Sequence, residues 1–367
     1  MKSIGIVTFH RSHNYGSALL AYAMVKVMES FGLDARVIDY EHPNSRLAYD
    51  FVLWNPHKTL WQNIHSFVSM GILGRRRKRR LAFHRFVRKN IPLTKKYRNR
   101  FDIKEHFDYL VCGSDQIWNP AAIDSRDDIY FLDFGDAQTV KFSYAASSGS
   151  RNVCSTDPAR TGLLLSSLKR IGVREEFMKD YIWDTYGLES TVNPDPTILL
   201  TVDEWAELEE SVPGLPARYI LVYSLENVSE TVNVAAQIGK ETGMPVVHIN
   251  NEQNIKNKRK AGADISLFDV SPGQFLWLFH HSSFVVSNSF HGNMFSIIFR
   301  RDFVCPVFEF KDTRMETLHE RIGLGRTRFV RNTSEINPSN LHIDYSPLEE
   351  NIGRFREEGL EFIRESL

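Results

Sequence analysis

The first forty residues alternate between two kinds of hydrophobic pattern, and this alternation restricts the folds that the chain can adopt. Residues 4–9 form a short apolar run typical of a buried strand, and residues 10–16 form a polar loop. Residues 17–31 carry apolar side chains at helical spacing and end at Gly32, a residue type that commonly terminates helices. Residues 35–40 return to strand character. A strand, a helix and a second strand in this order predict a parallel sheet.

The alternation continues in two series that are separated by a proline-rich turn. Strand-like runs at residues 109–112 and 142–146 belong to the first series, and those at 219–223 and 284–286 belong to the second. Between the two series lies Asn193-Pro194-Asp195-Pro196, where two prolines in four residues interrupt regular structure. The chain of 367 residues is also about twice a common single-domain length.

We therefore predict two Rossmann-like, doubly wound α/β domains that face a cleft. Residues 1–193 form the N-terminal domain and residues 194–345 the C-terminal domain. Residues 346–367 form an amphipathic helix that is placed to pack back on the N-terminal domain.

Charge and composition indicate an ordinary globular protein. Lys and Arg together number 45, as do Asp and Glu, so the net charge favours neither nucleic acid nor a membrane as a partner. Cys112, Cys154 and Cys305 lie far apart, which favours buried thiols over a disulfide framework or a metal site. Residues 1–7 are typical of a strand rather than a secretory signal, so we expect a cytoplasmic protein.

The strongest candidate for catalysis is His291, in the run Ser287-Asn288-Ser289-Phe290-His291-Gly292. This run follows an apolar strand and precedes a helical pattern, which is where open α/β sheets bind ligands. A histidine there can contact an anionic ligand and titrate near neutral pH. The small polar residues, including Ser289 and Gly292, leave the backbone approachable. The alternative is a histidine that caps a helix or packs in the core.

A second polar turn follows the strand at residues 109–112. Its residues Ser114, Asp115, Gln116 and Asn119 surround Trp118, a composition typical of a sugar site, in which a flat ring packs on a pyranose. Asp115 is then a candidate base for a sugar hydroxyl. The alternative is an aspartate that caps a helix or a turn.

The loop after the first strand contains Asn14, Tyr15 and Gly16. A dinucleotide-binding fold carries a G-x-G-x-x-G fingerprint here, and this loop has a single glycine, so that nucleotide-binding loop is absent. Its side-chain donors suit a polar substrate instead, and a solvated loop is the alternative. Two arginines, Arg174 after a strand and Arg314 at a helix start, are candidate clamps for a carboxylate or phosphate.

A basic run follows residues 60–68, which are apolar at helical spacing. It comprises Arg75, Arg76, Arg77, Lys78, Arg79 and Arg80. A solvated charge cluster is the ordinary interpretation, while peripheral contact with anionic lipid at the inner face of the membrane, or with an anionic glycan, is the alternative. No Cys/His spacing indicates zinc and no acidic cluster indicates a catalytic metal, so we predict no metal site.

Taken in order, these motifs resemble the polysaccharide pyruvyl transferase family. The resemblance rests on six segments: Gly5 to Phe9 with Asn14 to Ser17, Gly113 to Asn119, Ser143 to Ser147, Val173 to Glu175, Asp195 to Thr197, and Ser287 to Gly292. Each segment alone is weakly specific, and their common order over most of the chain makes the resemblance specific.

The resemblance implies a GT-B-like fold with the acceptor on the N-terminal side and the donor on the C-terminal side. It also implies transfer of the carboxyvinyl group of phosphoenolpyruvate to a sugar of a cell-surface polysaccharide or its precursor, which a lipid can carry. The product is a pyruvate ketal. His291 and Asp115 would act as the acid and the base of the reaction, and Arg174 would bind the anionic donor. No cofactor, metal or nucleotide would be required.

One position departs from the pattern. Some branches of the family have an arginine where this chain has Ser289, which removes a phosphate-binding charge.

Two other functions fit the fold: a GT-B glycosyltransferase with a nucleotide-sugar donor, and a glycan-binding relative without catalytic activity.

Overall fold

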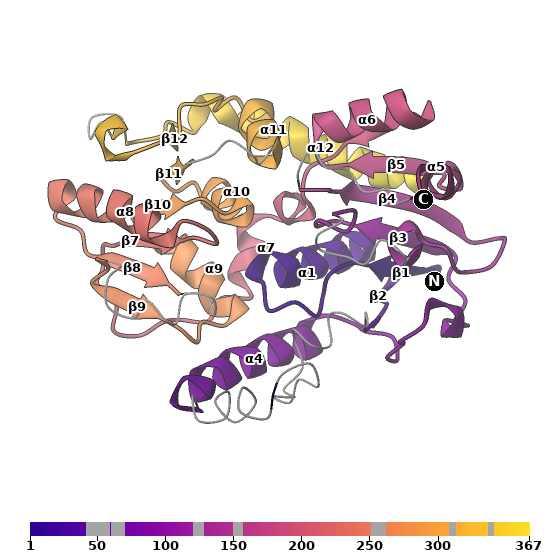
Figure 1. The fold of residues 1–367 in the computed structure, drawn as a ribbon, viewed down its shortest axis with the longest axis horizontal. Coiled ribbons are helices and arrows are strands. Elements are labelled where there is room, and N and C mark those ends of the chain that lie inside the picture. The colour runs from indigo at the N-terminus through magenta and orange to yellow at the C-terminus, as the bar shows by residue number, and fades with distance from the viewer. Residues whose placement is uncertain are drawn as a thin grey trace.

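Two six-stranded parallel sheets organise the molecule (Figure 1). The computed structural model describes residues 1–41, 59, 70–119, 128–149, 157–250, 262–307, 313–336 and 341–367. The first sheet has the order β2-β1-β3-β4-β5-β6. Its strands are β1 (Ser3–Val7), β2 (Asp34–Val37), β3 (Tyr109–Gly113), β4 (Val140–Ala146), β5 (Arg170–Val173) and β6 (Thr191–Val192).

The second sheet has the order β12-β11-β10-β7-β8-β9. Its strands are β7 (Ile220–Tyr223), β8 (Val246–Ile249), β9 (Ile265–Leu267), β10 (Phe284–Ser287), β11 (Phe303–Pro306) and β12 (Phe329–Val330). In each sheet the chain first runs outward to one edge, at β2 or β9, and then returns to the other side of its first strand and continues in the opposite direction, which is the doubly wound arrangement. The predicted fold class of two Rossmann-like domains is confirmed.

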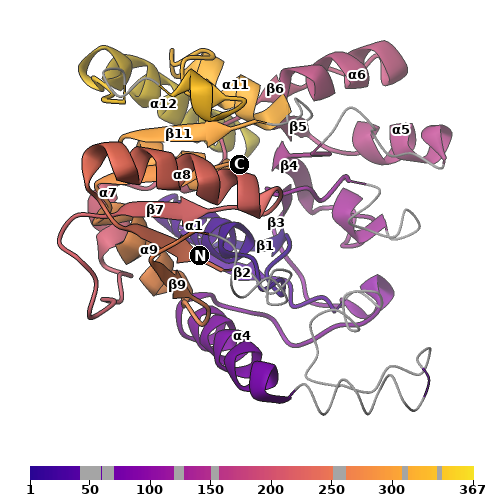
Figure 2. The same cartoon turned by 60° about the vertical axis from the view of Figure 1, so that its left-hand side comes forward.

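Helices cover the two sheets (Figure 2). They are α1 (Tyr15–Ser30), α4 (Met70–Asn90), α5 (Pro158–Ser166), α6 (Glu176–Tyr186), α7 (Val202–Ala206), α8 (Val228–Thr242), α9 (Pro272–His280), α10 (Phe290–Ile298), α11 (Thr313–Arg321) and α12 (Glu349–Ser366). The helix α1 is apolar on nearly all sides, because it is buried between the two halves of the molecule. The ring of Tyr22, for example, packs 5.8 Å from that of Trp205.

The C-terminal helix α12 returns to the first sheet (Figure 1). Lys169 donates a 3.1 Å hydrogen bond to the carbonyl of Ser366, and Phe362 packs 6.1 Å from the ring of Tyr144 in β4. The two sheets take their strands from residues 3–192 and 220–330. We keep the division at 193/194 and the separate C-terminal helix as our proposal for the domain boundaries.

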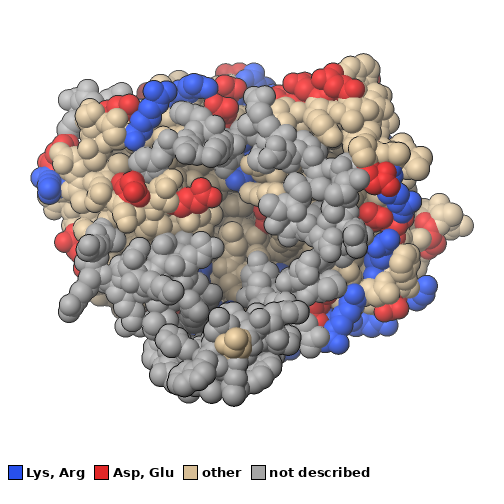
Figure 3. Space-filling model, in the orientation of Figure 1, with Lys and Arg blue, Asp and Glu red and all other residues tan. Residues whose placement is uncertain are grey.

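The described cysteines are core residues. Cys112 in β3 and Cys305 in β11 are buried, as predicted, and Cys154 lies outside the described residues. The molecule is hollowed near the centre of the face seen in Figure 3, with acidic and basic side chains mixed over the described surface around it.

Candidate functional site

Asp195 joins side chains that come from both sheets. Its Oδ2 atom lies 2.7 Å from Nη2 of Arg174, 3.5 Å from Nε2 of His291 and 3.4 Å from the hydroxyl of Ser114. Its Oδ1 atom accepts hydrogen bonds from the backbone N–H (3.0 Å) and the hydroxyl (2.6 Å) of Thr197. One carboxylate oxygen therefore anchors the start of the short 3₁₀ helix at residues 196–199, and the other faces the residues at the strand ends.

The carboxylate of Asp195 is ionised although it is buried. Burial alone would raise its pKa, but the Arg174 guanidinium, followed by His291 and Thr197, outweighs burial and holds the pKa below the usual range. Burial and the Asp195 charge raise the pKa of the neighbouring Tyr144 well above its ordinary value, so that phenol stays neutral. The site thus holds a buried ion pair beside a neutral phenol.

Arg174 has donors that the described protein does not use. Its side chain is 2% exposed, and its Nη2 group serves Asp195 and donates to the hydroxyl of Ser114. Its Nε and Nη1 groups are buried without a hydrogen-bond partner among the described residues. Buried charged donors are costly when unsatisfied, so this pair of N–H groups is suited to the oxygens of an anionic ligand.

A second arginine shares an aromatic ring with Arg174. The Cζ atoms of Arg174 and Arg314 lie 4.9 Å and 5.5 Å from the centre of the Phe290 ring. With its amide oxygen turned toward Arg314, Gln116 accepts from the Nη1 group at 2.7 Å and the Nη2 group at 3.1 Å. Two cations, one from each domain, therefore lie near one ring, and an anion that contacted both would offset their repulsion.

His291 is held at the first turn of α10 by contacts on several sides. Its Nε2 atom faces Asp195, and its ring meets that of Phe290 edge to face at 5.3 Å. A Cβ atom added at Gly16 would lie 2.0 Å from Nδ1 of His291. The absence of a side chain at position 16 therefore makes room for the imidazole. The backbone N–H of Gly16 donates 2.9 Å to the side chain of Asn14, which caps α1.

Asp115 is linked to the same turn of α1. Its Oδ2 atom accepts a 2.5 Å hydrogen bond from the hydroxyl of Ser17, the residue after Gly16. Its Oδ1 atom accepts from the backbone N–H of Gln116 at 2.8 Å. A positive φ of 74° at Asp115 turns the chain sharply at the end of β3. Asp115 and His291 thus flank the start of α1.

Comparison with known proteins decides the family. A family model described as polysaccharide pyruvyl transferase matches residues 14–305, a span that includes each of these residues apart from Arg314. The chain belongs to the polysaccharide pyruvyl transferase family. The resemblance seen in the sequence is confirmed, and the family is one of transferases. A search of curated proteins found no match.

Solved structures show the fold of this family member to be GT-B-like. The UDP-GlcNAc 2-epimerase of Methanocaldococcus jannaschii matches with a TM-score of 0.53 and 14% identity, covering 99% of each chain. The UDP-GlcNAc 2-epimerase of Neisseria meningitidis, solved with UDP-GlcNAc, matches with a TM-score of 0.53 and 12% identity over the whole of both chains. At this identity the likeness concerns the fold alone.

Two aromatic residues predicted to bind substrate lie in the core of the pyruvyl transferase chain instead. Tyr15 is fully buried, donates its hydroxyl to the Val270 carbonyl at 3.0 Å and stacks on Phe275 at 4.5 Å. Trp118 is also buried, donates its indole N–H to the Tyr130 carbonyl at 3.0 Å and stacks on Phe131 at 5.4 Å. We correct both predictions, because each ring packs between structural elements and offers no open face to a sugar.

Other predicted binding residues support the local backbone. A Cβ atom at Gly292 would lie 2.0 Å from the hydroxyl oxygen of Ser287, so this glycine allows α10 to pack against β10. Ser289 is the N-cap residue of α10, and its N–H donates to the Ser287 hydroxyl at 3.2 Å. The amide of Asn119 contacts that of Gln116 at 2.5 Å and thereby positions the partner of Arg314. The roles assigned to these residues in binding stay predictions.

The basic run lies in α4 and is not a uniform surface. Arg77 and Lys78 are exposed, and the side chains of Arg75 and Arg76 lie outside the described residues, as do residues 60–68. Arg79 is buried with its Cζ atom 5.1 Å from the centre of the Tyr15 ring, which corrects its assignment to a membrane-contact patch. Arg80 is half-buried. Within the described parts of the chain, no helix combines the length and apolar character needed to cross a bilayer.

Sequence reasoning did not identify two carboxylates of the site. Asp195 belonged to a family motif, but nothing in the sequence indicated that it would contact both Arg174 and His291. Glu175 also ended a family segment, and the structure shows that it is fully buried and accepts a hydrogen bond from the hydroxyl of Ser147. The available signal was the Asp195-Pro196-Thr197 motif itself, since an aspartate before a proline-started turn fixes the turn.

Proposed function

We propose that this chain transfers the carboxyvinyl group of phosphoenolpyruvate to a sugar of a cell-surface polysaccharide or of its precursor, which a lipid can carry. One observation carries the choice of donor: the unused N–H pair of Arg174 lies over the same ring as Arg314. Phosphoenolpyruvate carries a carboxylate and a phosphate on the same carbon, C2, and two guanidinium groups near one ring match such a double anion.

The proposed reaction begins with a proton moving from His291 to C3 of phosphoenolpyruvate. C2 then becomes an oxocarbenium-like electrophile, and a sugar hydroxyl attacks it while its proton passes to Asp115. A second hydroxyl attacks C2, the bond between C2 and the phosphate oxygen breaks, and phosphate leaves with the remaining proton. The products are a pyruvate ketal and inorganic phosphate. Passage of the proton from Asp115 back to His291 through solvent restores the enzyme, so atoms and charge balance without a cofactor or metal in the scheme.

The neighbours of the two residues support this division of roles. Nε2 of His291 lies 3.5 Å from the buried Asp195 carboxylate, which holds the imidazole beside Arg174. We assign the acid role to His291. The Asp115 carboxylate accepts hydrogen bonds from the Ser17 hydroxyl and the Gln116 backbone N–H, which fix its orientation, and we assign it the role of base.

The proposal is tested first by ligand-induced thermal stabilisation of the full chain. Phosphoenolpyruvate at about a hundred times its dissociation constant should stabilise the fold by about 2.7 kcal/mol. Arg314→Ala should lose this stabilisation. Arg321→Ala is the matched control, because Arg321 lies at the other end of α11 with its Cζ atom 5.3 Å from the centre of the Phe355 ring.

The same assay separates the alternatives. Stabilisation by a nucleoside diphosphate but not by phosphoenolpyruvate would replace the proposed donor with a nucleotide sugar. Stabilisation by a saccharide alone, with no effect of either donor, would indicate a glycan-binding relative. Equal stabilisation by inorganic phosphate and phosphoenolpyruvate would show that the site recognises phosphate without the carboxylate, and would remove the basis of the proposal.

A further inference from the structure

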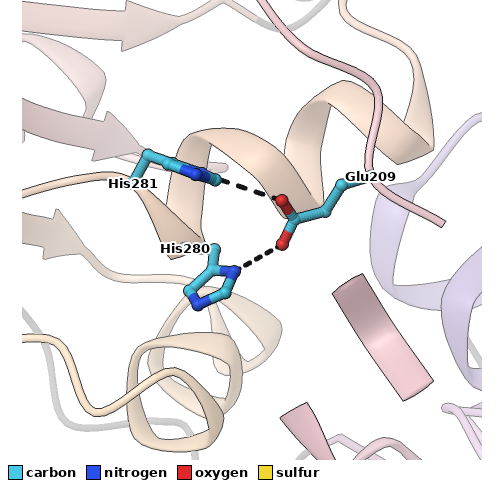
Figure 4. A group of neighbouring side chains, drawn as sticks. All are labelled: Glu209, His280 and His281. Atoms are coloured by element: carbon cyan, nitrogen blue, oxygen red, sulfur yellow. Dashed lines mark hydrogen bonds and ion pairs between the residues drawn. The ribbon is translucent and has the colours of Figure 1, made fainter. Parts of the chain in front are cut away.

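Three potential metal ligands meet at the end of α9, away from the site described above (Figure 4). Nδ1 of His280 lies 2.6 Å from Oε1 of Glu209, and Nδ1 of His281 lies 3.7 Å from Oε2 of the same carboxylate. One ligand atom from each of the three residues can be chosen so that all lie within 4.8 Å of one another. The carboxylate thus lies beside two imidazoles from consecutive residues, and Nδ1 of His281 is also 3.0 Å from the Trp277 carbonyl oxygen.

Neighbouring side chains hold the two imidazole rings in place. The His280 ring stacks on Phe299 at 4.6 Å with an interplanar angle of 13°, and the His281 ring stacks on Trp277 at 4.5 Å with an angle of 16°. The segment that carries Glu209 is fixed separately, because the next residue, Glu210, accepts a 2.5 Å hydrogen bond from the Ser271 hydroxyl at the start of α9. The three ligands are therefore positioned before any ion arrives, which lowers the ordering cost of binding.

We propose that Glu209, His280 and His281 bind a divalent transition-metal ion, with Zn²⁺ as the reference ion. Two imidazoles and one carboxylate form a ligand set that suits Zn²⁺ and related ions, whereas Mg²⁺ and Ca²⁺ prefer oxygen ligands alone. The sequence did not reveal the set, because Glu209 precedes His280 by 71 residues.

The position of this site indicates a structural role. His280 and His281 precede β10, and His291 follows it, so the metal ligands and the candidate catalytic histidine lie at opposite ends of one strand. Glu209 belongs to the segment between α7 and β7, which leads from the first sheet into the second. A bound ion would fasten this segment to α9, and it would contact none of the reacting atoms of the proposed transfer.

The test is a Zn²⁺ titration of the full chain by isothermal titration calorimetry after treatment with a chelator. We expect one ion per chain and a rise in the melting temperature on binding. Glu209→Gln should weaken the Zn²⁺ affinity by at least about tenfold. Removing a residue that only hydrogen-bonds to a metal ligand already has an effect of about this size, and Glu209 is itself a proposed ligand. His106→Asn is the matched control, since His106 contacts Asp136 at the same 2.6 Å but belongs to no three-ligand cluster among the described residues.

A second variant guards against a folding defect in the first. His281→Asn changes the most exposed of the three side chains, at 46% exposure, and should also weaken Zn²⁺ binding. Unchanged affinity in either well-folded variant, or a wild-type chain that binds no Zn²⁺, overturns the proposal. Stabilisation by phosphoenolpyruvate should be the same in the variants as in wild type, so this result is independent of the proposed transfer reaction.

Discussion

The imidazole of His291 occupies the space that a side chain at position 16 would need, since a Cβ atom on Gly16 would lie 2.0 Å from Nδ1. This relationship couples the first turn of α1 in one domain to the first turn of α10 in the other. It explains a glycine at a helix position where alanine would be about 1 kcal/mol better by propensity.

Gly16→Ala should therefore lower the turnover number by about a hundredfold, because displacing a catalytic group by about 1 Å has an effect of this size. The measurement is donor-dependent phosphate release, together with a urea unfolding curve to show that the fold survives. Gly353→Ala is the control, since a Cβ atom at this glycine of α12 meets no atom within 4 Å. Full activity in Gly16→Ala would show that His291 has no fixed position in catalysis.

Asp195→Asn should lower the free energy of unfolding by about 3–5 kcal/mol at neutral pH, because it leaves the Arg174 charge buried and unpaired. Urea unfolding measures this difference. Asp136→Asn is the control: Asp136 also contacts a basic side chain, His106, at 2.6 Å, but both partners are exposed and the pair contributes little. A comparable loss in the two variants would contradict the assignment of a buried ion pair.

The stability difference between wild type and Asp195→Asn should also depend on pH. The folded pKa of Asp195 lies below the ordinary carboxyl value of about 3.9. The contribution of the charge is therefore complete above about pH 4 and is lost as the pH falls toward the lowered folded pKa. The difference in the free energy of unfolding between the two proteins should be constant near neutral pH and should become smaller in acid. A difference that becomes larger in acid would contradict a lowered pKa of Asp195.

Tyr15→Phe should cost about 1 kcal/mol of stability and leave the KM for donor unchanged, because its hydroxyl bonds the Val270 carbonyl rather than a substrate. Tyr345→Phe is matched, since it removes a similar 2.7 Å bond to the Arg301 carbonyl. Steady-state kinetics with thermal unfolding separate the two roles. A rise in KM confined to Tyr15→Phe would restore the substrate contact expected from the sequence.

Apolar runs predicted the central strands of both sheets and the edge strand β2, but not the short strands β6, β9 and β12. The strands β6 and β12 have two residues each, and β9 has three residues without a buried side chain, so none shows a readable pattern. These three strands form because the longer neighbouring strands offer backbone N–H and C=O groups for pairing. Their formation therefore depends on the assembled sheet, and the residues of the short strands alone do not predict it.

The position of the site was predictable, and the direction in which its aromatic side chains point was not. His291, Arg174 and Asp115 follow strands of parallel sheets, and such strand ends converge on one edge. Tyr15 and Trp118 stand in equally polar turns, yet their rings pack in the core. The stacking partner of Tyr15 is Phe275, 260 residues later in the chain, and no pattern near Tyr15 indicates that contact.

The last prediction concerns the ring that Arg174 and Arg314 share. Phe290→Leu keeps an apolar side chain but removes the aromatic face, so each guanidinium loses an interaction of about 1 kcal/mol and is less well positioned. The KM for phosphoenolpyruvate should rise by about tenfold or more while the turnover number changes little. Phe355→Leu, which removes the ring near Arg321, should leave KM unchanged. If the turnover number falls instead and KM is constant, the Phe290 ring acts by orienting His291, which it meets edge to face. The two arginines would then not depend on the ring for donor binding.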